Sequence, residues 1–251
     1  MTRTNPPAAE VRAERSPLMA FAPYLVLSAL HLVLLSSGPA WSVTATKALL
    51  MPLLALAVVL LVRPLGVRDR RAPAPLLLAG IAFSWGGDVL LSFPGDGWFV
   101  AGLSSFLLAH VVYVVLFLRM PRARRRPPAW SYVYWAWMIV MLGLLLPHAG
   151  ALAAPIVLYA AAIGTMAMCA SLHGRWIALG GAFFIVSDSV LALGRFLPGY
   201  EFAGHDFAVM STYLAAQGLI AWGVVAETRA RRAASGPSSP SPDRPVGATA
   251  P

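Results

Sequence analysis

Long apolar stretches dominate this chain, each close to the length of a helix that crosses a membrane. A spanning helix needs about 20 mostly apolar residues, and breaks of glycine, proline or charged residues separate eight such stretches. The runs are continuous rather than alternating, which favours helices over barrel strands. The predicted spans are residues 18–36, 43–62, 74–93, 98–118, 129–147, 151–172, 176–193 and 207–226.

The composition excludes a water-soluble globular domain. Of the 251 residues, 59% are hydrophobic and 12% are charged, whereas soluble domains have about 45–50% apolar and about 25% charged residues. The formal net charge of +9 does not indicate a nucleic-acid partner, because the basic residues lie between apolar segments, where membrane topology places them. A single cysteine, Cys169, rules out an intrachain disulfide and a cysteine-based metal site.

The basic residues also predict the orientation in a bacterial-type inner or plasma membrane. Nearly all of the 19 Lys and Arg residues fall in the termini or in the loops on the same side, while Arg195 lies on the other. Both termini are therefore expected in the cytoplasm. We expect the first span to be retained, since its apolar run is long for a signal peptide. The predicted organisation is a polar cytoplasmic segment (1–17), an eight-helix membrane domain (18–227) and a disordered cytoplasmic tail (228–251).

Two segments of the chain resemble each other and indicate an internal repeat. AGIAFSWGGDVLLSF (79–93) and LGGAFFIVSDSVLAL (179–193) align with Asp88 opposite Asp188. One span later, FLLAH (106–110) matches YLAAQ (213–217) in residue type. The predicted fold is therefore all-α, with eight transmembrane helices arranged as two parallel four-helix repeats.

Asp88 and Asp188 are the two of the ten acidic residues that lie inside predicted spans. An aspartate at the centre of a spanning helix costs about 2.5–3.5 kcal/mol on insertion scales. Both lie roughly 8 Å from the outer end of their spans by the helical rise, and Lys47 lies roughly 6 Å deep. Two such carboxyls, brought together, share one proton and supply the acid and the base that hydrolysis needs. The alternatives are a proton relay in a transporter and structural ion pairs with Lys47 or Arg195.

Other polar residues in or beside the spans are candidates for supporting roles. His110, one turn before Tyr113, can orient an aspartate or a substrate group, or simply bond a neighbouring helix. Gln217 is its counterpart in the repeat and is typical of contacts between helices. Arg195, at the outer rim, can bind a lipid phosphate or reach toward water. No spacing typical of metal ligands indicates a metal site.

Taken together, these motifs resemble the YhhN family, which includes the TMEM86-like lysoplasmalogenases. The family pattern combines a Gly-Asp pair, a histidine motif in the next helix, a later Ser-Asp-Ser motif leading to Arg-Phe, and a lysine early in the second helix. Ala48 stands where the family often has proline. The matching residues are Lys47, Gly87, Asp88, Phe99, Gly102, Phe106, His110, Tyr113, Ser187, Asp188, Ser189, Arg195 and Phe196.

This resemblance implies a lipid hydrolase that cleaves the vinyl-ether bond of lysoplasmalogens into a fatty aldehyde and glycerophosphocholine or glycerophosphoethanolamine. Such a bond opens when its outer alkene carbon is protonated and water attacks the resulting oxocarbenium ion, so two carboxyls suffice, as in glycosidases. The expected partners are a lysophospholipid and the bilayer, without a cofactor, a nucleic acid or a protein partner. The implied catalytic residues are Asp88 and Asp188, and the implied supporting residues are Lys47, His110, Tyr113, Arg195 and Gln217.

Overall fold

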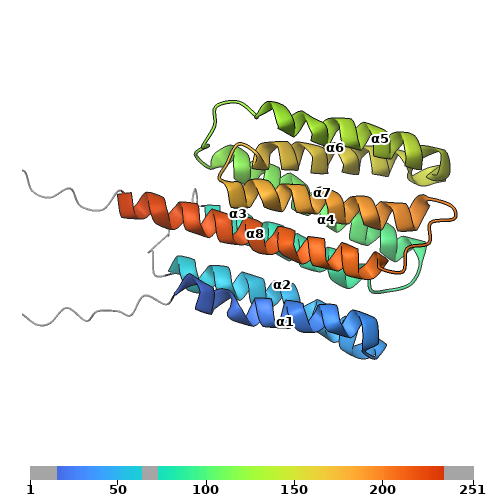
Figure 1. Ribbon diagram of the computed structural model, residues 1–251, viewed down its shortest axis with the longest axis horizontal. Coiled ribbons are helices and arrows are strands. Elements are labelled where there is room, and N and C mark those ends of the chain that lie inside the picture. Colours follow the sequence, from blue (N-terminus) through green and yellow to red (C-terminus); the bar gives the residue numbers. More distant parts are fainter. Residues whose placement is uncertain (1–15, 64–72, 235–251) are drawn as a thin grey trace, which may run out of the picture.

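The computed structural model describes residues 16–63 and 73–234, which form helices and turns without any strand. Eight helical segments within this part of the chain are long and apolar enough to cross a membrane, which confirms the predicted all-helical class. The helices are α1 (Pro17–Ser37), α2 (Ala40–Val62), α3 (Pro73–Leu90), α4 (Asp96–Arg119), α5 (Val133–Leu145), α6 (Ala153–Ala170), α7 (Arg175–Phe196) and α8 (His205–Ala234) (Figure 1).

Short 3₁₀ turns extend the fifth and sixth helices to spanning length. The turns Ala129–Tyr132 and Leu146–His148 flank α5, and Gly150–Leu152 precedes α6. The two helices therefore meet across a tight connection, where Gly150 takes a positive φ of 52° that favours glycine. The predicted division of this region into two spans is confirmed.

Many large apolar side chains face outward, as expected of a protein surrounded by lipid. Met19, Val26 and Ile139 are each about 70% exposed, although they lie within apolar helices. Lipid tails are as apolar as these side chains, so exposure there costs little. Helices also pair their own backbone N–H and C=O groups, because the hydrocarbon core offers these groups no hydrogen-bond partners.

The helices are arranged with α3, α4, α7 and α8 in the middle, α5 and α6 on one side, and α1 and α2 on the other (Figure 1). The most extensive contacts are those of α7 with α8 and of α3 with α4. Small residues allow these pairs to approach closely. A Cβ on Gly80 would overlap the ring of Tyr113 on α4, and one on Gly180 would overlap Ile220 on α8.

With the 3₁₀ turns counted, four helix ends differ from the predicted spans by three residues or more: α2 begins at Ala40 rather than at residue 43, α7 ends at Phe196 rather than at residue 193, and the ends of α3 and α8 also differ. α3 ends at Leu90, so Asp88 lies in its last turn rather than five residues before its end. α8 continues to Ala234, which makes residues 228–234 of the predicted tail helical; this stretch is rich in Ala and Arg, both strong helix formers. The rest of the predicted tail (235–251) and residues 1–15 of the predicted cytoplasmic segment lie outside the described residues.

Candidate active site

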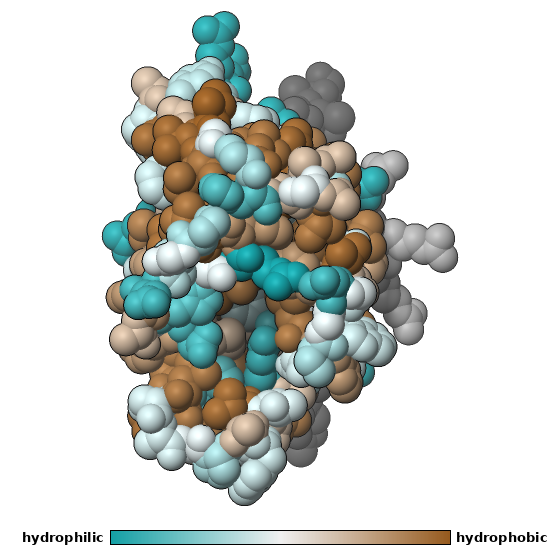
Figure 2. Space-filling view, turned by 90° about the vertical axis from the view of Figure 1, so that its right-hand side faces the viewer, coloured by the Kyte–Doolittle hydropathy of each residue, from teal (hydrophilic) through white to brown (hydrophobic). Residues whose placement is uncertain are grey.

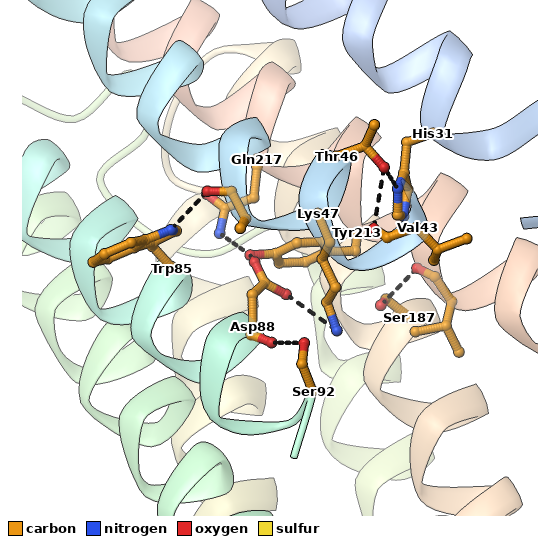
Figure 3. Close-up of polar contacts among 12 residues, drawn as sticks. His31, Val43, Thr46, Lys47, Trp85, Asp88, Ser92, Ser187, Tyr213 and Gln217 are labelled. Carbon is orange, nitrogen blue, oxygen red and sulfur yellow. Dashed lines mark hydrogen bonds and ion pairs between the residues drawn. The ribbon is translucent and has the colours of Figure 1, made fainter. Parts of the chain in front are cut away.

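Asp88 lies where α2, α3 and α8 converge, and its side chain is almost completely buried. The hydroxyl of Tyr213 on α8 donates a hydrogen bond to Asp88 Oδ2 at 2.7 Å. Lys47 on α2 places its Nζ 3.9 Å from Asp88 Oδ1 (Figure 3). The structure thus brings together Lys47 and Asp88, two of the residues that the sequence singles out. It also places Tyr213 of α8 against Asp88 of α3.

The side chain of Trp85 ties α3 to α2 beside this ion pair. Its indole Nε1 donates a hydrogen bond to the carbonyl oxygen of Ala48 at 2.8 Å (Figure 3). Because Ala48 follows Lys47 directly, this bond holds the lysine at the level of Asp88. The Lys47 side chain keeps 21% of its surface exposed, against 5% for that of Asp88. The site is therefore more open on the lysine side than on the aspartate side.

Tyr113 and Gln217 extend the hydrogen bonds behind Tyr213. The Tyr113 hydroxyl donates a hydrogen bond to Gln217 Oε1 at 2.7 Å. Gln217 Nε2 in turn donates a hydrogen bond to the Tyr213 hydroxyl at 3.5 Å. All three side chains are buried. Buried polar groups that are fully bonded hold a fixed geometry, so this chain of bonds fixes the phenol that faces Asp88.

Asp188 has a different set of partners, contributed by α4 and α6. The Tyr159 hydroxyl donates to Asp188 Oδ2 at 2.5 Å, and His110 Nε2 lies 3.2 Å from the same oxygen. His110 Nε2 is also 3.1 Å from the Tyr159 hydroxyl, and the imidazole is completely buried. His110 and Asp188 thus meet, which is the contact that a histidine orienting the aspartate would make.

An apolar pocket opens beside Asp188. It has a cavity volume of about 70 Å³ and a mostly apolar lining, which is the usual character of small-molecule sites. Asp188, Tyr159 and Ser189 are the polar groups among its lining residues. The remaining lining side chains come from α4, α5, α6 and α7 and are Phe99, Leu103, Met138, Met141, Leu142, Leu145, Ile156, Ala160, Ile163, Ile185, Leu191, Ala192 and Phe196.

The two carboxyl groups have separate hydrogen-bond partners. The ring of Phe184 packs against both sets of partners. Its centroid lies 5.2 Å from that of His110 and 5.8 Å from that of Tyr213. Each carboxyl accepts a hydrogen bond from its own tyrosine, and the sharing of one proton between the two aspartates stays a prediction.

Arg195 does not join the two carboxyls. It lies in the last turn of α7 and pairs with Asp96 in the first turn of α4. His31 on α1 is buried, with its Nδ1 2.7 Å from Thr46 Oγ1. Among the described residues, no group of three or more His, Cys, Asp or Glu side chains lies together as metal ligands would.

The sequence reasoning missed the roles of Tyr159 and Tyr213. Both lie well inside their helices, away from the ends where tyrosines usually mark the membrane interface. A phenol buried at that depth normally finds a hydrogen-bond partner. A search for tyrosines far from the interface would therefore have found both residues, although it would not have shown which aspartate each one contacts.

Comparisons with known proteins give a consistent result. The model of the YhhN family matches residues 42–224. A protein named "Lysoplasmalogenase" from Mycobacterium bovis is 37% identical over 197 residues, covering 73% of this chain and 72% of that protein. "Lysoplasmalogenase TMEM86A" from Homo sapiens is 32% identical over 233 residues, covering 87% of this chain and 92% of the relative. No solved structure matches the chain.

Proposed function

This chain belongs to the YhhN family, and from that premise we propose that it is a membrane-embedded hydrolase of lysoplasmalogens. It takes its lysophospholipid substrate from the bilayer and releases a fatty aldehyde and glycerophosphocholine or glycerophosphoethanolamine. The observation that carries this proposal is the position of Asp188, which lies in the wall of an apolar pocket with His110 and Tyr159 bonded to it. An alkenyl chain fits such a lining, and a carboxyl is the acid that its vinyl ether needs.

The reaction consumes one water and moves a proton in each of its three steps. A proton adds to the outer alkene carbon, the double-bond electrons form the new C–H bond, and the carbon attached to oxygen becomes an oxocarbenium ion. Water adds there and loses a proton, giving a hemiacetal. The hemiacetal C–O bond to glycerol then breaks, with a proton moving to the glycerol oxygen, and the aldehyde remains. Positioned acids and bases typically accelerate such steps by about 10²–10⁴-fold.

The surroundings of the two carboxyls suggest how they divide these steps. Asp188 lines the pocket, so we assign it the proton that reaches the alkene carbon. Asp88 lies beside the partly exposed Lys47, so we assign it the water. Lys47 is two turns from the start of α2, at the end of the bundle seen in Figure 2. That end is hollowed and has hydrophilic residues inside the hollow (Figure 2), which supports a route for water.

We also infer that the bundle consists of two related four-helix halves. Gly80 meets Tyr113, and Gly180 meets Ile220, and these pairs correspond in the alignment that places Asp88 opposite Asp188. Each aspartate also bonds to the opposite half. Asp88 receives its hydrogen bond from α8 and Asp188 contacts His110 of α4. Such an exchange is what a twofold relation between parallel halves would produce.

The distribution of basic residues supports a multi-pass protein of a bacterial-type plasma membrane with both termini in the cytoplasm. The connections that follow α1, α3, α5 and α7 then face outward. Cysteine-accessibility labelling tests this orientation. A single cysteine introduced at Glu201, in the exposed connection before α8, reacts with an impermeant reagent in intact cells. In inverted vesicles the same cysteine is protected.

The proposed activity is tested with purified protein reconstituted with a lysoplasmalogen. Wild type releases fatty aldehyde, whereas Asp88→Asn and Asp188→Asn do not. Asp206→Asn, which changes an exposed acid in the first turn of α8, is the matched control and keeps wild-type activity. If the wild-type protein instead carried protons or solute across sealed vesicles and left every lipid intact, the transporter alternative would replace the hydrolase.

A further inference from the structure

An ion pair stands at the end of the apolar pocket, two turns of α7 beyond Asp188. Arg195 on α7 is joined to Asp96 on α4 by a hydrogen bond between their charged groups. The side chains are 40% and 86% exposed, so a solvated ligand group can reach both. Exposed pairs of this kind typically contribute little to stability. Helix packing alone therefore gives little reason for placing two opposite charges here.

Aromatic side chains connect this ion pair with the pocket. The Arg195 guanidinium lies 4.6 Å from the ring centroid of Phe99, and Phe99 lines the pocket that contains Asp188. Phe196, the next residue after Arg195, also lines the pocket, and its ring centroid is 6.0 Å from that of Phe99. The pair is thus the polar continuation of the pocket wall, on the side of the bundle shown in Figure 2.

The spacing along α7 fits one lysophospholipid bound to both features. Arg195 follows Asp188 by seven residues, which is close to two helical turns, so both side chains leave the same face of α7. The rise over that distance is roughly 10 Å. With the vinyl ether beside Asp188, the glycerol backbone and its phosphate ester cover this distance and bring the head group to the ion pair.

We infer that Arg195 and Asp96 form a head-group site that selects zwitterionic lysophospholipids, an inference that rests on the proposed function. The guanidinium binds the phosphodiester with paired N–H donors. The carboxylate binds the ammonium group of choline or ethanolamine. In the absence of lipid the two side chains neutralise each other. When the zwitterion binds, their contact is replaced by two ion pairs, one between Arg195 and the phosphate and one between Asp96 and the ammonium group. A head group with phosphate but no amine meets the Asp96 charge and is disfavoured.

Four substrates with the same alkenyl chain test this site. They carry phosphocholine, phosphoethanolamine, a phosphate monoester, or no phosphate at all (1-alkenylglycerol). Arg195→Gln is expected to raise KM about tenfold for the three phosphate-bearing substrates and to leave alkenylglycerol unchanged, since it removes a charged hydrogen bond. Asp96→Asn is expected to raise KM about threefold for the two amine-bearing substrates and to lower it for the phosphate monoester.

Two further variants separate recognition from structure. Asp206→Asn changes an acid at the equivalent position in the first turn of α8, and it leaves all four KM values unchanged. The double variant Asp96→Arg with Arg195→Asp keeps an ion pair but exchanges the charges. Its KM for the zwitterionic substrates stays raised about tenfold, although its melting temperature matches wild type. Wild-type KM values in this exchanged variant, or equal changes on all four substrates, would overturn the inference.

Binding separates a failure of this inference from a failure of the proposed hydrolysis. Saturated 1-alkyl ether analogues carry the same four head groups but have no vinyl ether to cleave. Radiolabelled analogues are bound to the protein in lipid nanodiscs, with empty nanodiscs as background. The Kd values are expected to follow the same pattern as the KM values. If the pattern appeared without any aldehyde release from the vinyl ethers, the head-group site would stand and the hydrolase would fall.

Discussion

Asp88 and Asp188 occupy corresponding positions on two similar helices, yet their surroundings differ. Asp88 faces a lysine and a tyrosine and lies in a polar site beside a partly exposed ammonium group. Asp188 faces a histidine and a tyrosine and opens onto an apolar pocket. The comparison teaches that the same side chain acquires different chemistry from the helices packed against it.

Removing either carboxyl gives the largest expected effect. Asp188→Asn and Asp88→Asn each lower kcat by about 10²–10⁴-fold, the range of a lost acid or base. If Asp188 delivers the proton to carbon in the rate-limiting step, wild type releases aldehyde more slowly in D₂O than in H₂O. Aldehyde release in H₂O and D₂O measures both quantities. Full activity in either variant would contradict the assigned pair.

The two tyrosines distinguish the two sites from each other. Tyr159→Phe removes a hydroxyl that donates to Asp188 at 2.5 Å, and we expect kcat to fall about tenfold to a hundredfold, as for the loss of a hydrogen bond to a charged group. Tyr213→Phe leaves Asp88 with Lys47, so its loss is expected to be smaller. Steady-state kinetics of both variants show which substitution lowers kcat more. The reverse order would place the chemistry at Asp88.

The ion pair beside Asp88 is tested by stability rather than rate. Lys47→Met leaves a buried carboxyl without its cationic partner and is expected to lower the free energy of unfolding by about 2 kcal/mol. The double variant Lys47→Met with Asp88→Asn is expected to recover most of that loss, because no charge is then left unpaired. Circular dichroism measures the unfolding of wild type, the two single variants and the double variant in detergent, and the four free energies of unfolding give the interaction energy between Lys47 and Asp88. Additive losses would mean that the two groups are independent.

The close glycine contacts test the likeness of the two halves. Gly80→Ala and Gly180→Ala each push a methyl group into a neighbouring helix, and we expect both to destabilise the protein by about 1–3 kcal/mol. Gly143→Ala on α5 has open space within 4 Å and is the matched control, with a gain of up to about 1 kcal/mol from better helix propensity. Thermal unfolding of the three variants is the measurement. A large loss at one glycine only would weaken the proposed repeat.

The ion pair at the pocket end should have the smallest effect on stability. Because Asp96 and Arg195 are both exposed, Asp96→Asn is expected to change the free energy of unfolding by less than about 1 kcal/mol. The same unfolding measurement checks this. A loss as large as that of Lys47→Met would indicate a structural pair and would count against a role in head-group binding.

The sequence by itself determined the spans, the all-helical class and the identity of the unusual residues. Hydropathy and the cost of a buried charge are local properties, so eight apolar runs and two aspartates within them are visible without any contacts. The repeat alignment even placed Asp88 and Asp188 in corresponding positions. Lys47 and His110 could be named as candidates for the same reason, since polar groups in apolar helices are conspicuous.

Only the tertiary structure decided which groups meet. Nothing local to α6 indicates that Tyr159 faces Asp188 rather than lipid, because this depends on how α6 and α7 are rotated against each other. The same holds for Tyr213 at Asp88 and for the pairing of Arg195 with Asp96. Helix packing fixes these rotations through contacts between distant segments, so the different surroundings of the two aspartates appear only in the assembled bundle.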